Sequence, residues 1–133
     1  WNVNGRLISV KGVDDPHIGR DDYAGIPHSF NEQADLTLGV VHAPYLRVLD
    51  AMAADNAQLI LAGHTHGGQV RVPGYGALVT NCDLDTQQAR GLSQHRNSAL
   101  HVSAGLGCSR YAPFRFACPP EATLLTLTAR EGR

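Results

Sequence analysis

Three histidines in the middle of the chain have the residue type and the spacing of metal ligands. His64 and His66 form an H-x-H pair inside the glycine-rich run Gly63–Gln69, and His42 lies 22 positions before His64. Neutral imidazole is the most common metal ligand near neutral pH, and three imidazoles can hold a divalent ion at about 2.0–2.1 Å. Each histidine alone would more often be a surface residue, but their combination predicts a metal site.

Two apolar runs lead into these histidines and predict how they meet. Leu36–Val41 and Leu59–Ala62 are typical of strands covered on both faces. Between them, Pro44 fits the first turn of a helix, which has an apolar stripe formed by Leu46, Leu49, Met52 and Ala53. The strands of such a β-α-β unit are parallel, and their carboxyl ends share one edge of the sheet. We therefore expect His42 and His64 to converge there, with His66 facing the same way.

The other elements are shorter and place the chain in the α/β class. Asn4-Gly5 between Trp1–Val3 and Arg6–Val10 predicts a hairpin. Gly12–Phe30 predicts a surface loop with one helical turn. The remaining strand candidates, separated by glycines and prolines, are Gln69–Val72, Ala77–Val79, Leu100–Ser103 and Thr123–Thr128.

Several other polar residues are interpreted without a site role. His28, His95 and His101 are expected at the surface. Asp15-Pro16-His17 has the D-x-H spacing of metal ligands, but we expect no buried strand before it and interpret it as a loop. Asp14, Asp15, Asp83 and Asp85 are expected to cap turns, and Arg71, Arg110 and Arg115 to have surface or structural roles.

Thr65 and Gln69, which flank the H-x-H pair, are expected to orient its histidines through hydrogen bonds. The sequence assigns no general acid and no substrate-binding residue. Cys82, Cys108 and Cys118 are widely spaced and odd in number, so we interpret them as ordinary thiols.

The composition excludes several classes. The 133 residues are 43% hydrophobic and 17% charged, which is enough to bury a core, and the formal net charge is −1. No basic excess indicates a nucleic-acid surface. Apolar runs such as Leu36–Val41 are too short to span a bilayer.

Two motifs resemble those of a known family. Leu59–Gln69, LILAGHTHGGQ, resembles the last metal motif of the calcineurin-like metallophosphoesterases, and Leu38–Pro44 resembles the motif before it, a strand ending in His with Pro two residues later. Gly12–Asp22 and Gly105–Leu127 also resemble the bacterial metallophosphoesterase branch, so the resemblance covers most of the chain.

The resemblance implies half of a four-layer α-β-β-α sandwich, with a mixed sheet and few helices, over a dinuclear metal centre. It implies that His42 and His64 ligate one metal and His66 the other. Such enzymes hydrolyse phosphate mono- or diesters with two Mn, Fe or Zn ions, and a water or hydroxide attacks phosphorus in line.

The chain departs from the family by lacking the earlier motifs D-x-H, G-D-x-x-D and G-N-H-D/E in order before His42. It also begins at Trp1, and its only methionine is Met52. We therefore expect residues 1–133 to be the carboxy-terminal portion of an incomplete domain, whose first partner is the missing amino-terminal half.

Three consequences are expected. Three imidazoles without a carboxylate cannot offset the charge of two ions, so the chain alone should bind at most one metal, weakly, and have little phosphatase activity. Half a sandwich should leave an apolar sheet face uncovered and promote self-association. The substrate should be a small-molecule or lipid phosphoester.

Two alternatives stay open. The chain could be a non-catalytic, partner-binding module of the same fold. It could also be a self-contained enzyme with one metal on three histidines and an open water position. The metal itself is not fixed, because imidazole suits Zn, Fe, Mn and Ni.

Overall fold

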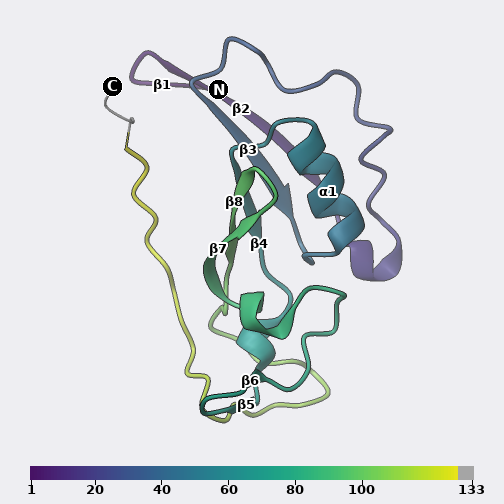
Figure 1. The fold of residues 1–133 in the computed structure, drawn as a ribbon, viewed down its shortest axis with the longest axis vertical. Coiled ribbons are helices and arrows are strands. Elements are labelled where there is room, and N and C mark those ends of the chain that lie inside the picture. Colours follow the sequence, from purple (N-terminus) through teal and green to yellow (C-terminus); the bar gives the residue numbers. More distant parts are fainter. Residues whose placement is uncertain (129–133) are drawn as a thin grey trace.

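The computed structural model describes residues 1–128, and most of its regular structure is one mixed sheet with the strand order β1-β2-β3-β4-β8-β7. Neighbouring strands are parallel from β2 (Arg6–Val13) through β3 (Leu36–Val41) and β4 (Leu59–Ala62) to β8 (Ser98–Val102). The outer strands β1 (Asn2–Val3) and β7 (Gly91–His95) pair antiparallel. The single α-helix of the described residues, α1 (Leu46–Ala54), lies against one face (Figure 1). The predicted α/β class with few helices is confirmed and agrees with half a sandwich.

The hydrophobic core lies between α1 and this sheet. Val48, Leu49 and Met52 of the helix are buried, and they belong to one cluster with Val41, Ile60, Leu100 and Val102 of the strands. Gly39 lets the helix approach, because a Cβ atom there would lie 2.8 Å from Met52 Sδ. Pro44 precedes the helix instead of lying in its first turn, since Tyr45 is the N-cap. Leu49, Met52 and Ala53 of the predicted stripe are buried, but Leu46 is exposed. The helix α1 connects β3 to β4.

The face of the sheet opposite α1 carries exposed apolar side chains. In β3, the exposed Val40 lies between the buried residues Gly39 and Val41. Val10 of β2 and Leu92 of β7 lie on the same face as Val40, and Val10, Val40 and Leu92 are 46%, 39% and 67% exposed. The expected uncovered apolar face is therefore present on the described residues.

The amino-terminal hairpin is confirmed, with Asn4 and Gly5 both at positive φ, but its second strand is longer than predicted. β2 continues through Lys11 and Gly12 to Val13 and pairs with β3 along its length. The charge of Lys11 is accommodated because its Nζ lies 2.5 Å from Asp55 Oδ2 and 4.4 Å from the centre of the Tyr23 ring. The loop predicted from Gly12 therefore begins only after Val13, and a strand, none of whose residues is fully buried, leads to within two residues of Asp15.

The region after β4 has little regular structure. It contains the small sheet of β5 (Arg71–Val72) and β6 (Gly76–Ala77), at the lower end of Figure 1, and two short 3₁₀ helices, His66–Gly68 and Thr86–Gln88. A third 3₁₀ helix, Pro16–Ile18, is the helical turn expected after β2. The predicted strand Thr123–Thr128 is wrong, and β7 was not predicted.

Candidate metal centre

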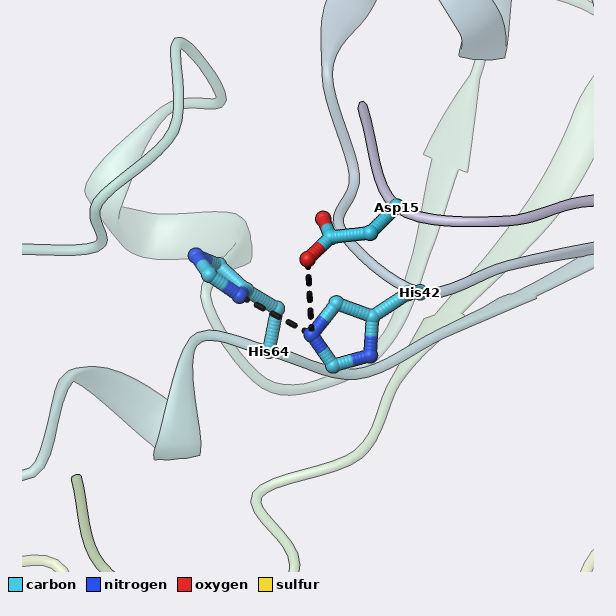
Figure 2. Close-up of side chains that lie close together, drawn as sticks. All are labelled: Asp15, His42 and His64. Carbon is cyan, nitrogen blue, oxygen red and sulfur yellow. Dashed lines mark hydrogen bonds and ion pairs between the residues drawn. The ribbon is translucent and has the colours of Figure 1, made fainter. Parts of the chain in front are cut away.

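Three ligand-type side chains meet where successive parallel strands end. Asp15 follows β2 by two residues, His42 follows β3 directly, and His64 follows β4 by two residues. Figure 2 shows the three side chains converging, with His42 Nε2 3.1 Å from His64 Nδ1 and 3.8 Å from Asp15 Oδ2. One ligand atom of each residue lies within 4.8 Å of the other two. We call these residues the sheet-edge group.

The geometry of the sheet-edge group fits a divalent ion. Ligand atoms about 2.0–2.1 Å from a tetrahedral metal lie about 3.4 Å from one another, close to the two distances at His42 Nε2. Burial, followed by the nearby His42 and His17, lowers the pKa of His64 and favours the neutral imidazole that a metal requires.

Asp15 has two functions in this arrangement. Its Oδ1 accepts a hydrogen bond from the backbone N–H of His17 at 2.9 Å, which confirms the predicted turn cap. Its Oδ2 faces His42, a contact that the sequence prediction missed because Gly12–Phe30 was expected to be a surface loop. The expectation of a site without a carboxylate is therefore corrected, since Asp15 supplies one negative charge.

His17 lies beside the group without belonging to it. Its ring centre is 4.8 Å from that of His64, and its Nδ1 is 2.9 Å from Tyr45 Oη. Tyr45 Oη in turn donates to the carbonyl of Asn81 at 3.3 Å. These contacts pack the loop after β2 against the start of α1 and thereby help to place Asp15.

His66, the third predicted ligand, lies outside the sheet-edge group. It adopts φ 49°, and His64 adopts φ 66°, a left-handed conformation that is uncommon for residues other than glycine. Burial, followed by the charge of Arg115, lowers the pKa of His66, so this imidazole is also biased toward its neutral form. Strained backbone at two predicted ligands is typical of a functional turn.

The side chains of Thr65 and Gln69 tie the turn Gly63–Gln69 to the segments around it. Thr65 Oγ1 donates to the carbonyl of Ala89 at 2.7 Å and accepts from Gly67 N at 3.2 Å. Gln69 Nε2 donates to the carbonyl of Ala112 at 2.8 Å, and its Oε1 accepts from Ser109 N. We expected Thr65 and Gln69 to orient the histidines through hydrogen bonds. They do not bond the imidazole rings directly, but they fix the turn that carries them.

Arg115 joins the same turn to the segment after β8. Its guanidinium donates to the carbonyls of His66 at 3.0 Å and Ala104 at 2.7 Å, and further bonds reach the carbonyls of Gly105, Gly107 and Cys118. Cys118 Sγ contacts the carbonyls of His66 and Gly67, both at 3.5 Å. The structural role expected for Arg115 is confirmed. Gln69, Arg115 and Cys118 all connect the turn to the segment after β8, and we call these three residues the clasp.

The remaining polar predictions have mixed outcomes. Asp85 accepts from Gln87 N at 2.8 Å and caps its turn as expected, whereas Asp83 accepts at 2.8 Å from Leu46 N, the first residue of α1, and not from its own turn. Arg71 donates to the Gly67 carbonyl at 2.9 Å. His28 is exposed. The surface assignments of two other histidines are wrong: His101 is buried in β8, and half-buried His95 lies 2.8 Å from Asp50. None of the three cysteines forms a disulfide in the part of the chain that the structure describes.

Known proteins with similar sequences include two from Bacillus subtilis and one from Escherichia coli. The chain is 32% identical over 125 residues to the uncharacterized metallophosphoesterase YkuE, a match that covers 94% of the chain and 42% of YkuE. It is 30% identical over 131 residues to the uncharacterized protein YpbG, which covers 98% of the chain and 46% of YpbG. It is 36% identical over 78 residues to the phosphodiesterase YaeI, which covers 59% of the chain and 28% of YaeI.

The chain thus spans less than half the length of the curated relatives that it matches. No family model and no solved structure matches it. The names of YkuE and YaeI support a metallophosphoesterase family and a phosphoester hydrolase, and the sheet-edge group is a possible metal-binding group of that kind of enzyme. Within residues 1–128, no helix has the length and apolar character needed to cross a membrane.

Proposed function

We propose that this chain provides the carboxy-terminal part of the dinuclear metal centre of a calcineurin-like metallophosphoesterase. In this proposal His42 and His64 hold one divalent ion (Mn, Fe or Zn), and His66 contributes to the second. The observation that carries it is the convergence of His42 and His64 at the carboxyl ends of neighbouring parallel strands, where His42 Nε2 lies 3.1 Å from His64 Nδ1.

The residues have distinct roles in this proposal. His42 and His64 would present neutral nitrogens to the ion, and Asp15, whose Oδ2 lies 3.8 Å from His42 Nε2, would offset part of its charge. The clasp and Thr65 keep the strained turn in place, so that His66 is positioned before a substrate arrives. When bound, the divalent ions supply positive charge that stabilises the phosphoryl group and lowers the pKa of water. Hydrolysis then adds water to phosphorus and releases the alcohol of the ester.

We propose further that the ligands of the second ion lie in an amino-terminal part of the same domain. That part is the first partner of the 133-residue chain, and its sheet would cover the apolar face that includes Val10 and Val40. Alone, the chain would bind at most one ion, turn over phosphodiesters poorly, and self-associate through this face. Static light scattering checks the last point, and a monomer at high concentration would contradict it.

The test is to read the coding sequence upstream of the Trp1 codon and to assay the protein that it encodes. We expect D-x-H, G-D-x-x-D and G-N-H-D/E in that order, and Mn²⁺-dependent hydrolysis of bis(p-nitrophenyl) phosphate by that longer protein. The matched His64→Ala variant should lose this activity. Robust turnover by the 133-residue chain alone, or a start codon just upstream without the three motifs, would contradict the proposal.

One observation favours a second candidate, a self-contained hydrolase with one metal. Two histidines and the carboxylate of Asp15 form a set of ligand atoms within 4.8 Å, and two histidines with one carboxylate is a known catalytic zinc set. Submicromolar one-to-one zinc binding by the 133-residue chain, together with esterase activity, would favour this candidate.

A further inference from the structure

A cavity of about 530 Å³ opens beside the metal-motif turn. His66, Gly68 and Gln69 form one side of it, and Ser109 and Ala112 from the segment after β8 form the other. Its volume lies in the range of about 300–1,000 Å³ that is usual for small-molecule sites. Because His66 lines the cavity and is also a proposed metal ligand, a phosphoester at the metal centre would lie next to it.

The lining is mostly apolar and includes no lysine, arginine, aspartate or glutamate. Its apolar members include Val70, Leu78, Val79, Tyr111 and Ala112, and its polar members are Thr65, His66, Gln69, Asn81 and Ser109. Leu78 and Val79 are 50% and 61% exposed, so this surface is open to a ligand. Four other cavities in the described part of the chain each include a carboxylate or a guanidinium. This cavity therefore disfavours a second phosphate or a sugar acid and favours an apolar group.

The wall that carries Ser109–Ala112 is held in place by the clasp. Gln69 bonds Ser109 N and the carbonyl of Ala112, while Arg115 bonds the carbonyls on either side of this stretch at Gly107 and Cys118. The same two side chains fix the turn of His66. The distance between the apolar wall and His66 is thereby set before a ligand binds, as a preorganised site requires.

We infer that this cavity receives the organic group of the substrate, and that the substrate is a phosphoester of an uncharged apolar alcohol, either alkyl or aryl. This inference rests on the proposed function, because it takes the phosphoryl group to lie at the metal centre. It narrows the substrate class, since nucleoside polyphosphates and sugar diphosphates would place charge against Leu78 and Val79.

The experiment titrates the Zn²⁺-loaded 133-residue chain with methylphosphonate, butylphosphonate and phenylphosphonate. Affinity is read from amide shifts in ¹⁵N heteronuclear NMR spectra. Butyl- and phenylphosphonate should bind at least about fivefold more tightly than methylphosphonate, since each buried methylene contributes up to about fourfold. The gain, taken as the ratio to methylphosphonate affinity in the same variant, should fall below about twofold in Val79→Asn and in Tyr111→Ser. The matched control is Val72→Asn, which lies on β5 outside this cavity.

The outcomes separate the inference from the proposed function. Zinc-dependent methylphosphonate binding without any gain for the butyl or phenyl group overturns the cavity assignment and leaves the proposed function standing. No zinc-dependent binding of any phosphonate by the 133-residue chain also overturns the cavity assignment, while the proposed function is tested separately by the activity of the longer protein. Concentration-dependent shifts at Leu78, Val79 and Tyr111 without ligand would mean that a second copy of the chain fills the cavity, which also overturns the assignment.

Discussion

The two parts of the candidate site are built in different ways. The sheet-edge group of Asp15, His42 and His64 depends on three parallel strands, whose register places the three residues at one edge. The turn that carries His66 depends on side chains that donate to backbone carbonyls about 40–50 residues distant, as Arg115 does to His66 and Gln69 to Ala112. The first part is supported by regular hydrogen-bond ladders, and the second by a few individual contacts. Substitutions in the turn that carries His66 should therefore affect stability more than metal affinity. Substitutions in the sheet-edge group should affect metal affinity more than stability.

The largest expected effect is at Gly68, where the turn packs against β6. Gly68 has φ 82°, and a Cβ atom would overlap Ala77 Cβ. We expect Gly68→Ala to lower the free energy of unfolding by about 3 kcal/mol, measured by urea denaturation. Gly19→Ala is the matched control, because Gly19 has φ 71° with nothing within 4 Å, and it should cost only about 1 kcal/mol. Equal losses for the two variants would mean that the packing against Ala77 is not formed.

The next effect separates the two parts directly. Arg115→Ala removes bonds to five carbonyls, so it should lower the free energy of unfolding by about 2 kcal/mol, and Arg115→Lys should lose about half of that. Arg110→Ala, at an exposed arginine, should change stability by less than about 0.5 kcal/mol. Zinc affinity of the sheet-edge group should stay within about threefold in all three variants. A large loss of affinity in Arg115→Lys would show that the two parts are coupled.

A smaller effect is expected at Asp15. Asp15→Asn keeps an oxygen that can accept from His17 N but removes the negative charge beside His42. Zinc affinity, measured by calorimetry, should fall about tenfold while stability changes little. Asp14→Asn is the control, because that carboxylate is 65% exposed and faces Arg20. Unchanged affinity in Asp15→Asn would remove Asp15 from the sheet-edge group.

The smallest effect is on the pH dependence of the metal-free chain. The pKa values of His64 and His66 are lowered from 6.5 in the folded state, mainly by burial. The unfolded chain therefore binds more protons just below pH 6.5, and stability should fall as the pH drops through that range. The paired carboxylates Asp21 and Asp35, whose pKa values are lowered from 3.8, should contribute only at lower pH. Urea denaturation of His64→Gln should show a shallower fall between pH 6.5 and 5, and an unchanged slope would contradict the assignment.

The sheet-edge group could be predicted in part because its causes are periodic. The apolar runs before His42 and His64 indicate parallel strands, and parallel strands bring their ends together. Asp15 could not be predicted in the same way, since Lys11 and Gly12 interrupt the apolar pattern of β2. Lys11 is tolerated only because Asp55, 44 residues later, neutralises it.

The sequence indicated a supporting role for Gln69 and a surface or structural role for Arg115, but it did not indicate the partners of either residue. Arg115 and Gln69 are ordinary polar residues in irregular segments, and their roles arise from carbonyl groups that only the folded backbone gathers. The same reason explains His101, which is buried by the sheet although its neighbours in sequence indicate a surface position. Local patterns therefore predict the strands and the helix, whereas contacts between distant irregular segments must be seen in the structure.

The most direct test of the account is a calorimetric titration of the 133-residue chain with Zn²⁺, compared with His42→Ala and His64→Ala. The account predicts one ion per chain in the unsubstituted protein and at least about 100-fold weaker binding in each variant, because either change removes a ligand of the same ion. Absence of zinc binding, or equal affinity in all three proteins, would contradict a metal centre at this edge of the sheet.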